Sequence, residues 1–148
     1  MLFRLVGVLL ICPAFPVFSQ DARNVPKASI ISLDKAITRS VPSGKASIKV
    51  LAEGQKAFVG QLSLAAGAKV PLHRDPTEEY LYIVSGEGLI SIDGQTTKLV
   101  SGMTVYMPAN ALVTFQNGDK PLVALQIFAG PASAKKYEKW ALLSPKKP

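Results

Sequence analysis

The chain has 148 residues, a formal net charge of +7 and a single cysteine. This length is enough for one domain, and a lone cysteine excludes both an internal disulfide and a zinc site built from several thiolates. The positive charge could suit nucleic acid, but the lysines near the C-terminus are interpreted as a solvated basic tail without an aromatic stacking platform, so no nucleic-acid partner is expected.

The first residues have the composition of an export signal. Arg4 gives a positively charged start and residues 5–18 are almost wholly apolar, as in a signal peptide. This apolar run is shorter than the roughly 17–25 residues that a membrane-spanning helix needs, and Pro13 and Pro16 interrupt it. The prediction is a signal peptide over residues 1–19, an exported protein, periplasmic or secreted, and no stable membrane span.

Residues 20–44 are predicted to form an N-terminal arm. Their composition is mixed, and prolines interrupt it. Within the arm, residues 32–37 fit one short helical turn, with the Ser32 side chain as its cap.

From residue 45 to residue 130 the chain consists of short runs of Val, Ile, Leu and aromatic residues, separated by turn residues. No helical pattern between them is long enough to connect parallel strands, so an antiparallel sandwich or barrel is expected. The predicted strands are residues 46–51, 57–64, 80–84, 89–92, 96–99, 104–107, 112–116 and 121–128.

Residues that tolerate positive φ mark the predicted turns. Asp93-Gly94 and Asn117-Gly118 are each predicted as a two-residue hairpin loop. Other glycines are expected where a small barrel must turn sharply: Gly67, Gly86, Gly88 and Gly102.

Two spaced motifs lie in this segment. The first contains, in order, Gly67, His73, Asp75, Glu79 and Gly86. The second contains, in order, Gly102, Pro108, Asn110, Val113 and Asn117. Their spacing resembles the double motif of type-2 cupins, G-x5-H-x-H-x3/4-E-x6-G and G-x5-P-x-G-x2-H-x3-N. The resemblance implies an all-β double-stranded β-helix, a small jelly-roll barrel, over residues 45–130.

The same resemblance implies a metal site, from which this chain departs. In the family the metal is held by two His and the Glu of the first motif and the His of the second. By position, His73 and Glu79 match, Asp75 is a carboxylate in place of the second His, and Val113 replaces the fourth ligand. We expect either no metal or one weakly bound divalent ion (Fe, Mn or Zn) on His73, Asp75 and Glu79. The alternative is a polar cluster of these side chains with Arg74.

Strand alternation gives these side chains a direction. His73 and Asp75 are two residues apart, so they point the same way in extended chain. Glu79 shares its strand face with Leu81 and Ile83, which predicts that Glu79 faces the barrel interior.

Residues 131–148 are predicted as a C-terminal helix, spanning 133–143, followed by a basic tail. Tyr137 and Trp140 would pack against the barrel, whereas Lys135, Lys136 and Lys139 would be solvated.

Three functions remain open. The favoured one is an exported small-molecule binding module with a degenerate metal site. The second is a metal-dependent oxygenase or lyase acting on a small organic acid or sugar derivative. The third is a structural interaction module of the cell envelope, and in each case the resemblance implies a homodimer. A hydrolase triad is excluded because Ser85 and Ser91 have no second His near them in the sequence, and no catalytic residue is assigned.

Overall fold

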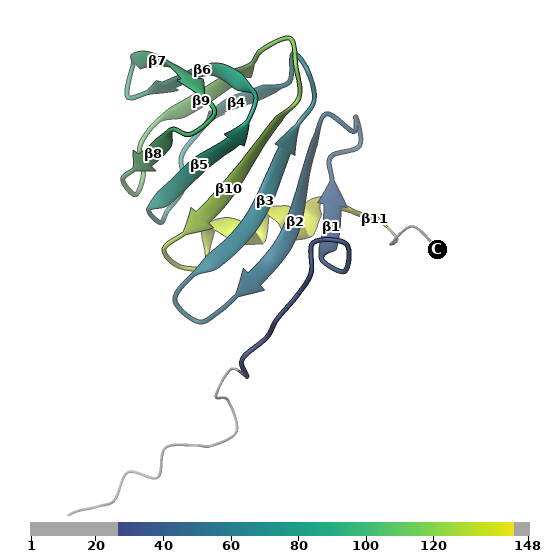
Figure 1. Cartoon of the computed structure of the whole chain (residues 1–148). Coiled ribbons are helices and arrows are strands. Elements are labelled where there is room, and N and C mark those ends of the chain that lie inside the picture. The colour runs from purple at the N-terminus through teal and green to yellow at the C-terminus, as the bar shows by residue number, and fades with distance from the viewer. Residues whose placement is uncertain (1–26, 144–148) are drawn as a thin grey trace, which may run out of the picture.

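The computed structural model describes residues 27–143. Most of these residues lie in strands, along which buried and more exposed side chains alternate. They form two antiparallel sheets (Figure 1), one ordered β11-β1-β2-β3-β10-β5-β8 and the other β4-β9-β6-β7. The strands are β1 (Ile37–Ser40), β2 (Ala46–Glu53), β3 (Phe58–Leu64), β4 (Lys69–His73), β5 (Glu79–Ser85), β6 (Glu87–Ile92), β7 (Gln95–Val100), β8 (Thr104–Met107), β9 (Val113–Asn117), β10 (Leu122–Phe128) and β11 (Ala141–Leu143). The predicted all-β architecture is confirmed.

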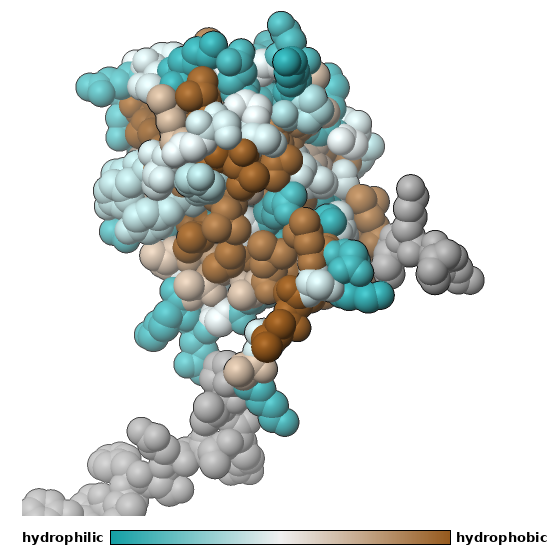
Figure 2. Space-filling model, in the orientation of Figure 1, coloured by the Kyte–Doolittle hydropathy of each residue, from teal (hydrophilic) through white to brown (hydrophobic). Residues whose placement is uncertain are grey.

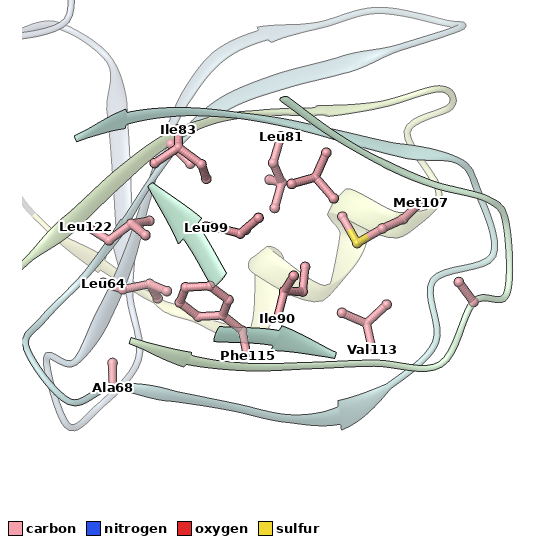
Figure 3. Close-up of a cluster of buried hydrophobic side chains, with 13 residues drawn as sticks. Leu64, Ala68, Leu81, Ile83, Ile90, Leu99, Met107, Val113, Phe115 and Leu122 are labelled. Carbon is pink, nitrogen blue, oxygen red and sulfur yellow. The ribbon is translucent and has the colours of Figure 1, made fainter. Parts of the chain in front are cut away.

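The core lies between the two sheets, because the period of two sends every second side chain inward. Along β5, Leu81 and Ile83 are buried while Tyr80 and Tyr82 are exposed. Figure 3 shows Leu81 and Ile83 facing Phe115 of the smaller sheet. Each such buried side chain stabilises the fold by about 1.5–3 kcal/mol relative to an exposed one.

Each of the predicted strands is present, with boundaries shifted by a few residues at most. Three further strands, β1, β4 and β11, were not predicted. The predicted arm is therefore wrong in part, since residues 37–40 pair with β2 on one side and β11 on the other. At Ser32 the structure has a turn, in which the Lys35 amide donates to the Ser32 carbonyl at 3.0 Å.

The two predicted hairpin loops differ in outcome. Asp93 and Gly94 join β6 to β7 with φ of 48° and 85°, which confirms that loop. The loop at Asn117 and Gly118 is wrong, because the chain there crosses from the smaller sheet to the larger one. The buried Asn117 amide holds this crossing, donating from Nδ2 to the carbonyls of Ala65 at 2.7 Å and Lys120 at 3.0 Å.

The C-terminal segment is shorter in helix than predicted. A 3-10 helix, η2 (Ser133–Lys139), lies behind β10, β3 and β2 in Figure 1. At Trp140 the backbone becomes extended, and β11 then pairs with β1. The expected packing of Tyr137 is confirmed, since it is buried with Phe58 and Phe128. No helix among residues 27–143 is long and apolar enough to cross a membrane; the predicted signal peptide, residues 1–19, lies outside the described residues.

Candidate functional site

A cavity of about 620 Å³ opens between the two sheets. Its walls are mostly apolar, and Figure 3 shows several of these side chains pointing into the same space, from both sheets: Leu64, Leu81, Ile90, Met107, Val113 and Phe115. A volume of this size and an apolar lining are typical of sites for small organic molecules.

One wall of the cavity carries a chain of hydrogen bonds from η2 to β5. The Tyr137 hydroxyl donates to Oε1 of Gln126, and Nε2 of Gln126 donates to Oε1 of Glu79 at 2.5 Å. All three side chains are buried. Because a hydroxyl donor requires the amide oxygen as acceptor, the Gln126 amide is oriented with its nitrogen toward Glu79.

A second polar group joins η2 to the end of β4. Nζ of Lys136 lies 2.6 Å from Oδ2 of Asp75, and Nε2 of His73 lies 3.5 Å from the same oxygen. The His73 Nδ1 lies 2.9 Å from the Pro71 carbonyl, which can only accept, so Nδ1 carries a proton. When Nε2 is also protonated, the ring is a cation, and this second N–H lies on the side of the ring nearest Asp75.

The surroundings of the two carboxyl groups shift their pKa values in opposite directions. Hydrogen bonding to Asp75 raises the pKa of His73, against the effect of burial. Burial alone would raise the pKa of Asp75, but hydrogen bonds from His73 and Lys136 outweigh it and the pKa is lowered. Burial raises the pKa of Glu79 despite the Gln126 hydrogen bond and the charge of Lys136. Asp75 is therefore the anion of the site, and Glu79 is the group that favours its neutral form.

The predicted metal ligands are brought near one another but are already engaged. His73 and Glu79 line the cavity, whereas Asp75 is not part of its wall. Val113, opposite His73 in the β4–β9 pairing, adds an apolar side chain to that wall. Among residues 27–143, no group of three or more His, Cys, Asp or Glu side chains is arranged to hold a metal ion.

His73, Asp75 and Glu79 thus fit a metal ion poorly, because the Asp75 carboxylate is already paired with the ammonium of Lys136. The expected alternative was a polar cluster with Arg74, and it is wrong in part because the cation beside Asp75 is Lys136. The Arg74 side chain is exposed and donates instead to the Asn110 carbonyl.

Three site residues were not predicted: Gln126, Lys136 and Tyr137. Gln126 left a signal in the sequence, because it is a polar residue on the inward face of β10 between Ala124 and Phe128. No feature of the sequence indicated Lys136, and the prediction that it is solvated is wrong in part, because its half-buried side chain pairs with Asp75.

Comparison with known proteins identifies the barrel. A family model described as "Cupin domain" matches residues 60–128. An uncharacterised protein of Streptomyces coelicolor is 31% identical over 75 residues, covering 51% of this chain and 71% of that protein. An uncharacterised protein of Methanocaldococcus jannaschii is 32% identical over 75 residues, covering 49% of this chain and 60% of that protein's length.

Solved structures share the fold at low sequence identity. An RmlC-like cupin from Shewanella frigidimarina has a TM-score of 0.63 and 15% identity, covering 70% of this chain and 92% of its own. A structure described as a predicted oxalate decarboxylase from Thermotoga maritima has a TM-score of 0.63 and 18% identity, covering 69% and 99%. At these identities the likeness establishes the fold alone.

Proposed function

Since the chain belongs to the cupin family, we propose that it is a binding protein that holds a small, largely apolar molecule inside its barrel. The observation that carries this proposal is the cavity of about 620 Å³, whose walls are apolar apart from a few polar groups. A few convergent polar groups in an apolar cavity are enough to orient a bound ligand, and binding of this kind requires no catalytic group.

The departures from the family's metal motif support binding rather than metal catalysis. Val113 adds apolar surface where an imidazole would stand, and Asp75 is neutralised by Lys136 at 2.6 Å. A carboxylate that is already paired with an ammonium is a poor ligand for a second cation, because that ion would have to displace the lysine.

Uptake of the neutral dye Nile red tests the proposal. The wild-type protein is expected to enhance the dye's fluorescence, and Val113→Phe is expected to abolish this by filling the cavity. Thr114→Phe is the matched control, because Thr114 is the next residue on β9 and is absent from the cavity wall. Uptake that is equal in the two variants, with both folded by circular dichroism, would place the dye elsewhere and contradict the proposal.

A metal-dependent oxygenase or lyase is the second candidate. His73 and Glu79, which match two ligand positions of the family's metal motif, both line the cavity. Elemental analysis of protein purified without chelator separates the two candidates. Near-stoichiometric iron, manganese or zinc that is lost in both His73→Ala and Glu79→Gln would favour the enzyme.

The proposal includes export. The charged start and the apolar run of residues 5–18 support it. Protein recovered from the periplasm or the medium is expected to lack about the first 19 residues, which its mass measured by mass spectrometry would show. An intact N-terminus on exclusively cytoplasmic protein would contradict export.

The proposal also includes a homodimer. Apolar side chains gather on the outer face of the larger sheet, as Figure 2 shows in brown over β10, β3 and β2, and such patches are typical of interfaces. Those on β5 and β10 are Tyr80, Tyr82, Val84, Val123, Leu125 and Ile127. Light scattering after gel filtration is expected to give a dimer, which Leu125→Lys converts to a monomer. Thr97→Lys, at an exposed position on β7 in the other sheet, is the control.

A further inference from the structure

We infer that the cavity is a binding site for a small organic anion with an apolar body, in which the ammonium of Lys136 takes the place of a metal ion. The inference rests on the proposed function and adds the chemical class of the ligand. It starts from the charges that line the cavity.

These charges are mostly positive. The wall includes Lys45, Lys69 and Lys136 together with His73, whereas Glu79 is its one acidic side chain among residues 27–143. Oε1 of Glu79 already accepts a hydrogen bond from Gln126, so that oxygen has a donor within the wall itself.

Lys136 is held so that it can still bind a ligand. Its ammonium has three N–H donors, and the one hydrogen bond found for it among residues 27–143 goes to Asp75 at 2.6 Å. The same nitrogen lies 4.8 Å from the centre of the Phe128 ring, which stabilises its charge. Donors therefore remain for a carboxylate in the cavity.

Asp75 orients the cations without opposing the ligand. It pairs with both Lys136 and His73 through Oδ2, yet it is not part of the cavity wall. Both cationic side chains line the cavity, and the carboxylate that balances their charge does not. An anion that enters meets the cations first, which is the order that favours electrostatic recognition.

The lysines at the opening fit the same ligand class. Lys45 and Lys69 are exposed residues of the wall, and the chain as a whole carries a net charge of +7. A basic opening raises the local concentration of anions. The apolar walls, Leu64, Leu81, Ile90 and Phe115 among them, then account for an apolar body rather than an inorganic ion.

Calorimetric titration with three ligands of one chain length tests the inference at a single pH near neutrality: octanoate, 1-octanol and octylammonium. We expect octanoate to bind about tenfold more tightly than 1-octanol, because a charge-assisted hydrogen bond contributes about that factor, and octylammonium to bind least. Lys136→Met is expected to remove the preference for octanoate. Lys139→Met, an exposed lysine of the same helix, is the matched control and should keep it.

Asp75→Asn guards against a purely structural effect of the lysine variant. It frees Lys136 from its counter-charge and is expected to strengthen octanoate binding, the opposite of Lys136→Met. A general loss of folding would weaken binding in both variants. Circular dichroism of each variant confirms that it is folded.

The outcomes separate the inference from the proposed function. If 1-octanol or octylammonium binds as tightly as octanoate, the anion site is wrong and the apolar binding cavity stands. If none of the three binds and Nile red is not taken up, both are wrong. If octanoate is preferred but Lys136→Met leaves the preference unchanged, Lys136 is not the group that binds the anion.

Discussion

At the scale of single residues, the site is defined by which charge lies next to which. Asp75 is 61 residues from Lys136 in the chain, yet their charged atoms lie 2.6 Å apart. Glu79, in contrast, has a neutral amide as its hydrogen-bond partner. One carboxylate is therefore stabilised as an anion and the other is not, although both belong to one short motif.

Replacing Glu79 by Gln should change how stability depends on pH. Burial raises the folded-state pKa of Glu79 above its unfolded value. Its contribution to stability is then fully present below the unfolded pKa, about 4.3, and is lost as pH rises through the folded pKa. The stability of wild type relative to Glu79→Gln is expected to fall from pH 4 to pH 8, measured by urea denaturation.

The charged groups around Glu79, which are Lys136, Asp75 and His73, are present in both proteins, so their own titration largely cancels in this comparison. Glu138→Gln, the same exchange at an exposed residue, is the control. A constant offset for Glu79→Gln would contradict the expectation.

Tyr137→Phe isolates one buried hydrogen bond. The change keeps the ring packed against Phe58 and Phe128 but leaves Oε1 of the buried Gln126 without the hydroxyl donor. An unsatisfied buried polar group costs about 1–3 kcal/mol, and we expect that loss in the free energy of unfolding. Tyr106→Phe removes an exposed hydrogen bond to Glu78 and should cost less; equal costs would show that the Gln126 contact is not important.

At the scale of elements, strand alternation explains what was predicted and what was missed. The strands with buried apolar faces were found because their pattern is strong. β4 was missed because it is an edge strand that contains Pro71 and is largely exposed, and proline normally argues against a strand. β1 and β11 are four and three residues long, too short for a pattern of period two to stand out.

Two glycines at the ends of strands form a matched pair for testing close packing. Gly86 and Gly102 both have a φ of 88°, but a Cβ at Gly86 would lie 2.6 Å from the Pro121 carbonyl oxygen, whereas a Cβ at Gly102 would meet no atom of the described part of the chain within 4 Å. Gly102→Ala is expected to cost about 1–2 kcal/mol from the left-handed backbone alone. Gly86→Ala should cost about 1–3 kcal/mol more, from overpacking. Chemical denaturation measures both, and equal values would exclude the steric contribution.

At the scale of the whole molecule, the C-terminal segment completes both the core and the site. η2 contributes Ala134 and Tyr137 to a buried cluster with residues of β2, β3 and β10. The same segment supplies Lys136 to the cavity wall, and β11 extends the larger sheet beside β1. The barrel motif alone is therefore an incomplete binding site.

Ending the chain after Gly130 should destabilise the whole barrel. Phe58 and Phe128 would lose the covering of Tyr137, and exposing one large core side chain costs several kcal/mol, equivalent to a fall in melting temperature of more than about 10 °C. Calorimetry of the shortened protein measures this fall. Replacing Lys135, Glu138 and Lys139 together by Ala alters exposed residues of η2 and is the control. A shortened protein that melts with the wild type would show that the barrel folds without this segment.

The sequence by itself determined the barrel, most of its strands and the inward direction of Glu79, because alternation with a period of two is a local property that each strand expresses alone. The match of residues 60–128 to a cupin domain agrees with that part. Only the tertiary structure decided the partners: Lys136 for Asp75, Gln126 and Tyr137 for Glu79. Those contacts join residues far apart in the chain, and no local pattern encodes which distant side chain a carboxylate will meet once the sheets have packed.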